Sequence, residues 1–338
     1  MPTKIKRLAL SIGLAVLAVG GVRTIYPSDS QGITIGRLVL NSDDSAERQV
    51  GALEFIAAWE LRSRNDDFGG ISALTVLNDG RFVGIGDAGT LIGFELTRDG
   101  QMDSTFILSL PGSQGPGFNY KDRDSEGIAY DPDSGQFWVS FENKHAIRRY
   151  SKDFTRQTGL VRPPEMQDWP KNKGAEGIIR LNDGRFIVVA ESIDDDTHKA
   201  LLFSGDPIER SSTITPFRIR PPSGYRVTDG VQLPDGRIAI INRAIGFPQG
   251  FSAKVSLLTL GTIRRNDMVS AKVIASLASP LLVDNFEGIA FTREGEADIL
   301  WLISDNNFSI FQRTILMKFR LSPERDSKKP EASTAPGL

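Results

Sequence analysis

Acidic residues recur at one position of an internal repeat, each directly before a glycine that opens an apolar stretch. The acid–Gly–apolar pattern occurs at Glu126, Glu176, Asp229 and Glu287. Carboxylates gathered away from water stay charged together only if a cation or arginines compensate them; otherwise some take up protons. An oxygen-only ligand set selects Ca²⁺, with Mg²⁺ as the alternative. The pattern therefore predicts a cation or ligand site, although each acid taken singly could simply cap a turn.

A second chemically suited position lies seven residues after the turn glycine of each of the first four repeat units. It holds an acid in the first three units and Arg243 in the fourth, and Asp305 takes the same place by pattern in the fifth. The second strand of a hairpin runs back toward the start of the first, so both positions should reach one end of the fold. The predicted cation ligands are Asp87, Glu126, Glu142, Glu176, Glu191, Asp229, Glu287 and Asp305, of which Glu126, Glu176 and Glu287 are also the predicted catalytic residues.

The elements that must position these acids are short strands in repeated hairpins. Units start near residues 69, 125, 175, 228 and 286, with Gly69 at the acid position of the first, and three of them turn at Asp-Gly, a strong hairpin signal. Each unit has room for four strands, which is typical of a β-propeller blade. We predict an all-β propeller with five blades, or six if residues 33–63 and the C-terminus build another. Gly51–Ser63 should pair with the last blade and close the ring.

Basic residues stand in the loops that lead into the same end of the predicted propeller. Arg123, Lys173 and Arg226 precede repeat units, and Arg243 adds a fourth cation. Together with a metal they would suit a small anionic substrate such as a phosphate ester. They could equally pair with the acids and hold the loops in place.

The rest of the chain limits the alternatives. A formal net charge of -2 over 338 residues argues against nucleic-acid binding, and the absence of cysteine excludes disulfides and thiolate sites. Residues 1–30 resemble a secretory signal peptide and leader, with an uncleaved anchor as the alternative. We therefore expect a periplasmic or secreted monomer with one domain over residues 31–321 and a disordered tail over 322–338.

Three segments carry a resemblance to a known family: SEGIAYDPDSGQFWVSFE, GAEGIIRLNDGRFIVVAES, and DNFEGIAF with LWLISDNNFSIFQRTILMKFRL. They resemble the phytase-like domain, "esterase-like activity of phytase", of exported bacterial proteins, over Gly69 to Leu321. The resemblance implies a propeller-like fold. It also implies an active site formed by Glu126, Glu176, Asp229, Glu287 and Asp305.

Three functions fit these features. The first is hydrolysis of phosphate esters or diesters through a divalent cation at the carboxylates. The second is a non-catalytic propeller that binds a cell-envelope ligand and holds Ca²⁺ for structure alone. The third is a calcium-dependent hydrolase of the lactonase type, against which the basic loops count mildly.

Overall fold

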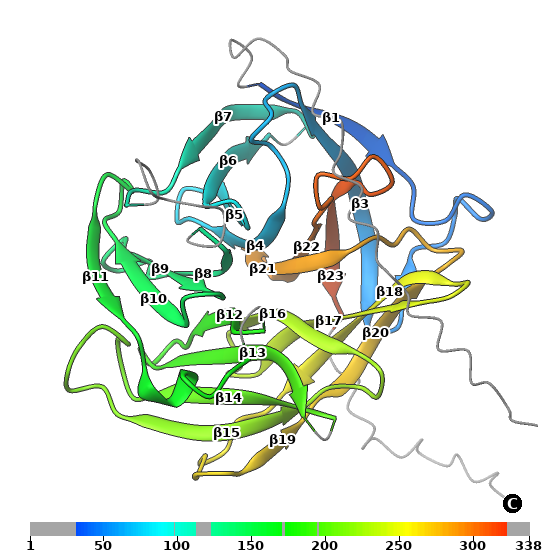
Figure 1. The fold of residues 1–338 in the computed structure, drawn as a ribbon. Helices are drawn as coiled ribbons and strands as arrows, with labels where there is room; N and C mark the ends of the chain where they lie inside the picture. The colour runs from blue at the N-terminus through cyan, green and yellow to red at the C-terminus, as the bar shows by residue number, and fades with distance from the viewer. Residues whose placement is uncertain (1–31, 98, 113–122, 171–172, 195, 323–338) are drawn as a thin grey trace, which may run out of the picture.

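Five β-sheets surround a central axis in the computed structural model, which describes residues 32–97, 99–112, 123–170, 173–194 and 196–322 (Figure 1). The strands nearest the axis are β4, β8, β12, β16 and β21, and each contacts the next around the ring. The fold is therefore the predicted all-β propeller with five blades. Among the described residues, no helix is long and apolar enough to cross a membrane.

The first three blades follow one another along the chain. Blade 1 consists of β4 (Ile71–Val76), β5 (Phe82–Gly86), β6 (Thr90–Leu96) and β7 (Met102–Ser109). Blade 2 consists of β8 (Ser125–Tyr130), β9 (Phe137–Phe141), β10 (Ala146–Tyr150) and β11 (Gln157–Val161), followed by the short 3-10 helix η2 (Pro164–Met166). Blade 3 consists of β12 (Ala175–Arg180), β13 (Phe186–Asp194), β14 (Thr197–Phe203) and β15 (Ile214–Arg220), with β19 (Met268–Ser270) parallel at its outer edge.

The last two blades complete the ring. Blade 4 consists of β16 (Arg226–Gln232), β17 (Ile238–Gly246), β18 (Gly250–Leu258) and β20 (Lys272–Ala278). Blade 5 consists of β21 (Phe286–Glu294), β22 (Ala297–Ser304) and β23 (Thr314–Leu321), then β3 (Leu53–Ser63) and β1 (Ile33–Leu38) from the start of the domain. The short β2 (Gln49–Val50) pairs with β3.

Pairing of β3 with β23 closes the propeller. The two strands run antiparallel from Thr314 opposite Leu61 to Leu321 opposite Leu53. The prediction of a closing strand at Gly51–Ser63 is confirmed, and the six-blade alternative is wrong, because both chain ends complete one blade. The predicted signal peptide and the tail after Ser322 lie outside the described residues.

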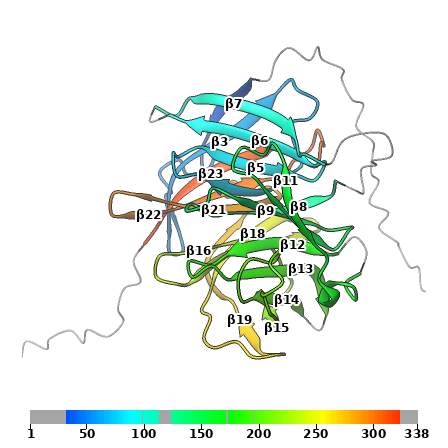
Figure 2. The ribbon, with the colours of Figure 1, turned by 90° about the vertical axis from the view of Figure 1, so that its left-hand side faces the viewer.

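The turns between the first two strands of blades 1, 3 and 4 share one construction. Gly80, Gly184 and Gly236 adopt φ of 87°, 86° and 87°, a left-handed conformation that favours glycine. The following arginine in each turn pairs with the aspartate before the glycine, as Arg81 does with Asp79 at 2.7 Å. These turns lie at the end of the propeller that also carries the β21–β22 hairpin turn, which projects from the molecule in Figure 2. The acids lie at the opposite end of the channel.

Apolar side chains pack between neighbouring blades. The Trp138 ring on β9 lies 4.8 Å from Phe186 on β13, and the Trp301 ring on β22 lies 4.8 Å from Phe82 on β5. Aromatic contacts of this kind add to the stability that burial of the rings already gives. Because the blades are held together from their flanks, the end of the central channel can carry polar groups.

Candidate functional site

A strongly acidic pocket occupies the end of the channel at which the inner strands begin. Its volume is about 210 Å³, and its lining holds eight carboxylates and one guanidinium. The lining consists of Ser72, Asp87, Asp124, Glu126, Glu142, Glu176, Glu191, Arg243, Glu287, Asp305 and Asn307. Seven of the eight predicted cation ligands are therefore brought together. Asp229 is the exception.

β-Bulges at the start of the inner strands turn the first group of acids toward this pocket. Glu126, Glu176 and Glu287 are each the extra residue at a register shift, between Ser125 and Gly127 in blade 2 for example. A bulge leaves the extra residue out of the strand ladder and redirects its side chain. The glycine that follows lies against the next inner strand, and a β-carbon on Gly127 would lie 2.8 Å from the Glu176 carbonyl oxygen.

The same bulges correct two register assignments made from the sequence. In blade 1 the bulged residue is Ser72, so Ser72 rather than Gly69 occupies the position of the acid. In blade 4 it is Thr228, and Asp229 occupies the position that is glycine in blade 3. A signal for this shift is present in the sequence, because Ser72, Glu176 and Thr228 all lie eight residues before their turn glycine, whereas Asp229 lies seven before it.

Asp229 points into the channel below the pocket and bonds to backbone. Its Oδ2 accepts a hydrogen bond from the Ile289 N–H at 3.0 Å, and its Oδ1 accepts one from the Gly230 N–H at 2.8 Å. Burial raises its pKa well above the ordinary value, and the backbone N–H groups of Ile289, Gly230 and Leu74 oppose that rise. Asp229 thus links β16 to the inner strands of blades 5 and 1.

The second group of acids is held at the ends of the second strands by matching backbone bonds. The N–H of Asp87 donates to Gly70 O, that of Glu142 to Asp124 O, and that of Glu191 to Gly174 O, each at 2.9 Å. The Asp305 N–H donates to Asn285 O at 2.8 Å. The predicted equivalence of these positions across the blades is confirmed by this common backbone arrangement.

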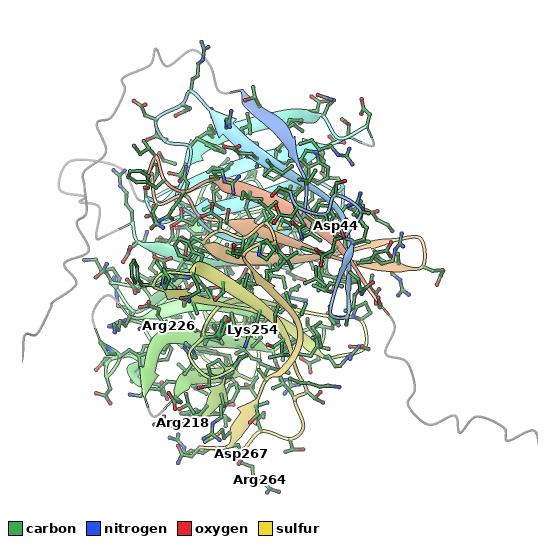
Figure 3. The ribbon with its side chains drawn as sticks, turned by 90° about the vertical axis from the view of Figure 1, so that its right-hand side faces the viewer. Asp44, Arg218, Arg226, Lys254, Arg264 and Asp267 are labelled. Carbon is green, nitrogen blue, oxygen red and sulfur yellow. The ribbon has the colours of Figure 1, made fainter. Side chains whose placement is uncertain are left out.

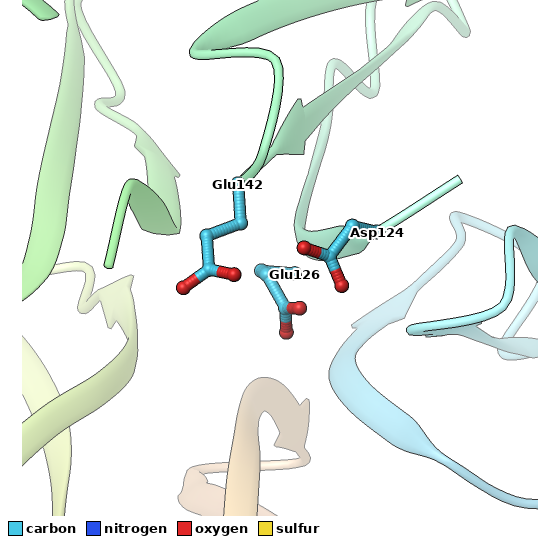
Figure 4. A group of neighbouring side chains, drawn as sticks. All are labelled: Asp124, Glu126 and Glu142. Atoms are coloured by element: carbon cyan, nitrogen blue, oxygen red, sulfur yellow. The ribbon is translucent and has the colours of Figure 1, made fainter. Parts of the chain in front are cut away.

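Two sets of three acids lie close enough to share one ion. Carboxylate oxygens of Asp124, Glu126 and Glu142 all lie within 4.8 Å of one another, and the same holds for Glu142, Glu176 and Glu191. Figure 4 shows the first set, with Glu142 facing Asp124 and Glu126 across a small space. Sequence reasoning missed Asp124, because it precedes the repeated acid in blade 2 alone and therefore leaves no periodic signal.

Burial and mutual repulsion raise the pKa of the clustered carboxyls. Burial is the main cause for Glu126 and Glu176, whose pKa values lie well above the ordinary range, and neighbouring acids raise them further. Burial raises the pKa of Glu142 and of Glu287 to about 8 and that of Asp305 to about 7. A divalent cation would oppose these shifts, because it favours the ionised carboxylates.

Arginine side chains border the pocket on the side of blade 4. Arg243 pairs with Glu287 at 3.1 Å, and Arg226 pairs with Glu191 at 3.2 Å. A neighbouring cavity of about 400 Å³ lies against both arginines and Glu191. Figure 3 shows Arg226 on the side of the molecule away from the β21–β22 turn, as the pocket requires. Neither Arg123 nor Lys173, both predicted to bind substrate, lies in the lining of these two cavities.

A larger cavity, of about 650 Å³, lies elsewhere, between blades 5 and 1. Its walls include Trp59, Phe82 and Trp301, which are almost fully buried and belong to the core between these blades. Volume alone does not identify a site. We assign the chemistry to the smaller acidic pocket, because charged groups converge there.

Comparisons with known proteins bear on the family. Among solved structures, the major allergen Mala s 1 of Malassezia sympodialis is similar at 13% identity and a TM-score of 0.46, covering 90% of this chain and 99% of that one. The Dos1 propeller is similar at 7% identity and a TM-score of 0.36, covering 80% and 76%. A search of curated proteins finds no match. The sequence model of the family described as "Phytase-like: Esterase-like activity of phytase" matches residues 66–308. With its acidic repeat set at one end of a five-bladed propeller, the chain belongs to this phytase-like family.

Proposed function

We propose that the protein hydrolyses phosphate esters or diesters at the acidic pocket, with a divalent cation held by the carboxylates. Membership of the phytase-like family supports a hydrolase of the esterase type. The observation that carries the proposal is the lining itself, in which eight carboxylates meet one guanidinium. The proposed ion is Ca²⁺, with Mg²⁺ as the alternative, because both prefer oxygen ligands.

The donor set fits such an ion. Asp124, Glu126 and Glu142 would hold it, or Glu142, Glu176 and Glu191, because each set offers oxygens within 4.8 Å of one another. When bound, a divalent cation polarises a phosphoryl oxygen and acidifies water. The raised pKa values of Glu126 and Glu176 support this assignment. Buried carboxylates that repel one another are stabilised either by taking up protons or by binding a cation.

The protein's own side chains would then perform the remaining steps. Arg243 and Arg226 would bind the anionic oxygens of the substrate, as guanidinium groups do with phosphate. A carboxylate, Glu176 or Glu126, would accept a proton from the attacking water as the new P–O bond forms. Glu287, which belongs to neither set of proposed cation ligands and whose pKa burial raises, would give a proton to the alcohol that leaves as the ester P–O bond breaks. The products are the free alcohol and, from a monoester, phosphate or, from a diester, the monoester, so the atoms of one water are accounted for.

The proposal is tested by turnover of bis-p-nitrophenyl phosphate and p-nitrophenyl phosphate, with metal analysis of the same protein. We expect Ca²⁺ to support hydrolysis and EDTA to abolish it. Glu176→Gln should lower kcat/KM by roughly a hundredfold or more, as expected when an acid–base group is lost. Glu296→Gln is the matched control, because that side chain is fully exposed on the turn at the other end of the propeller.

Two results would contradict the proposal. One is full activity in excess EDTA, which would remove the cation from the reaction. The other is bound cation without turnover of any ester, which would favour the ligand-binding alternative. We also propose export to the periplasm or exterior, which the mass of the mature protein from cell fractions would test.

A further inference from the structure

One loop at the pocket differs from its four counterparts in length and in polarity. Residues 305–313 join β22 to β23 and form the longest of the five loops between second and third strands. The loop presents three apolar side chains to solvent: Phe308 is 37% exposed, Ile310 90% and Phe311 86%. Its first residue, Asp305, and its third, Asn307, line the acidic pocket.

The loop is fixed by its own hydrogen bonds and by one bond to blade 1. The Asn306 Oδ1 accepts from the N–H of Phe308 and from the N–H of Gly70, both at 3.1 Å. The Asp305 Oδ1 accepts from the Asn307 N–H at 2.7 Å, and Asn307 Nδ2 donates to Gln312 Oε1 at 2.7 Å. The exposed apolar residues are therefore carried on an ordered support.

Phe308 adopts a backbone conformation that is costly for a bulky residue. Its φ is 51°, and the φ of Asn307 before it is 48°. Asparagine tolerates the left-handed region, whereas a bulky residue such as phenylalanine rarely adopts it. Such strain persists only where the surroundings hold it, and it gathers at functional sites. Here it sets an aromatic ring beside the pocket.

The position of the ring relative to the acids is given by Gly70. A β-carbon on Gly70 would lie 2.7 Å from Cε2 of Phe308 and 2.4 Å from Oδ1 of Asp87. The ring edge and a pocket carboxylate thus flank the same glycine. A ligand that left the pocket on the side of blades 5 and 1 would therefore pass this glycine and the ring.

We infer that the site takes an ester whose alcohol part is aromatic or aliphatic, and that this part packs on Phe308, with Ile310 and Phe311 as the outer part of the same surface. The inference rests on the proposed function for the location of the phosphate. The occupant follows from continuity with the pocket: an apolar group joined to a phosphate held there would cover Phe308 first.

The test is calorimetric binding of 1-naphthyl phosphate and of inorganic phosphate, with Ca²⁺ saturating. Phe308→Asn removes the ring and leaves a residue suited to the left-handed backbone, so the variant should melt no lower than the parent. We expect it to weaken 1-naphthyl phosphate about tenfold, the effect of losing one aromatic contact, and to leave inorganic phosphate unchanged. Phe247→Asn is the matched control, because Phe247 is 98% exposed and lies on the blade 4 hairpin outside the pocket lining.

The outcomes separate this inference from the proposed function. Equal affinity of the parent for both ligands, or equal losses in the two variants, would overturn the inference. Unchanged kcat/KM for 1-naphthyl phosphate in Phe308→Asn would also overturn it while leaving hydrolysis established. Tight, ring-dependent binding of 1-naphthyl phosphate without turnover would support the inference and contradict the hydrolase.

Discussion

Blades 3 and 4 carry the same acid–glycine motif, yet the carboxylates of Glu176 and Asp229 have different roles. Glu176 of blade 3 lies in the pocket among acids, and neighbouring charges add to the rise that burial causes in its pKa. Asp229 of blade 4 lies below the pocket, where backbone N–H groups oppose the same rise. The protein satisfies Asp229 with hydrogen bonds and surrounds Glu176 with like charge.

One repeat thus supplies both a structural support and a pocket acid. A shift of one residue at the blade 4 bulge moves the acid from the extra position to the position of the glycine. There the carboxylate bridges three inner strands, while Arg243 of the same blade supplies the one guanidinium of the pocket lining. Blade 4 therefore contributes a guanidinium and a structural link, whereas blade 3 contributes two pocket acids and blade 2 contributes three, Asp124 included.

Loss of the Asp229 carboxylate should destabilise the fold strongly. Asp229→Ala would leave the buried N–H groups of Ile289 and Gly230 without their acceptor. At about 1–3 kcal/mol for each unsatisfied group, we expect a loss of roughly 3–5 kcal/mol in the free energy of unfolding. Urea denaturation of the metal-free protein measures it. A loss below about 1 kcal/mol would show that Asp229 is not the link described here.

A second effect follows from pH in the metal-free protein. Glu142 and Glu287 have a folded pKa of about 8 against an ordinary 4.5, so the folded chain holds protons that the unfolded chain releases. Stability is therefore greatest below pH 4.5 as far as these groups are concerned, and it falls as pH rises toward 8. Between pH 6 and 8 we expect a loss of roughly 2 kcal/mol, less than two independent groups would give, because each carboxyl interacts with neighbouring acids that titrate with it.

The double variant Glu142→Gln/Glu287→Gln tests that origin, because it should weaken the dependence and leave the part that Asp305 and the other clustered acids contribute. Saturating Ca²⁺ should reverse the trend in the parent, since binding releases the protons and the apparent affinity rises with pH. Stability of the metal-free parent that rises from pH 6 to 8 would contradict the assignment. Denaturation at fixed ionic strength keeps general charge effects constant.

Much of the fold could be predicted from the sequence, because its determinants are local. Asp-Gly turns at Asp79, Asp183 and Asp235 mark hairpins, and alternating apolar residues mark the strands between them. The convergence of both acidic positions followed from hairpin geometry alone. The register at Asp229 was not predicted from hairpin geometry, because the contacts between the inner strands determine where a bulge forms. The spacing from Asp229 to its turn glycine, one residue shorter than that from Glu176 to its own, was the available signal.

Other site features leave no periodic trace. Asp124 lies in the loop before β8, and only blade 2 has an acid at this position. Phe308 lies in a loop that is not repeated in the other blades. Arg123 and Lys173 looked equivalent to Arg226 from the sequence, yet of the three only Arg226 lines the cavity of about 400 Å³ beside Glu191. The direction of a loop residue depends on tertiary contacts that spacing does not encode.

The glycine of the motif offers a sharper internal comparison. A β-carbon on Gly127 would lie 2.7 Å from Ser140 Oγ and 2.8 Å from the Glu176 carbonyl, whereas on Gly177 its nearest neighbour, Thr228 O, is 3.3 Å away. Gly127→Ala should therefore cost about 2 kcal/mol more than Gly177→Ala, within the usual range for overpacking. Equal losses in thermal unfolding would mean that the inner strands adjust equally well on both sides of blade 3.

Substitutions of Glu176 and Asp229 should change the stability of the metal-free protein in opposite directions. In the metal-free protein Glu176→Gln removes a buried group that neighbouring acids disfavour, so we expect stability at pH 8 to rise by about 1 kcal/mol, while Asp229→Ala lowers it. At a Ca²⁺ concentration that saturates the parent, Glu176→Gln should instead be less stable than the parent. A tenfold weaker cation affinity lowers the stability gained from binding by about 1.4 kcal/mol. Glu296→Gln should change neither value. If Glu176→Gln instead destabilised the metal-free protein as Asp229→Ala does, Glu176 would be a structural acid like Asp229. The distinction between a carboxylate that the backbone satisfies and one left for an ion would then fail.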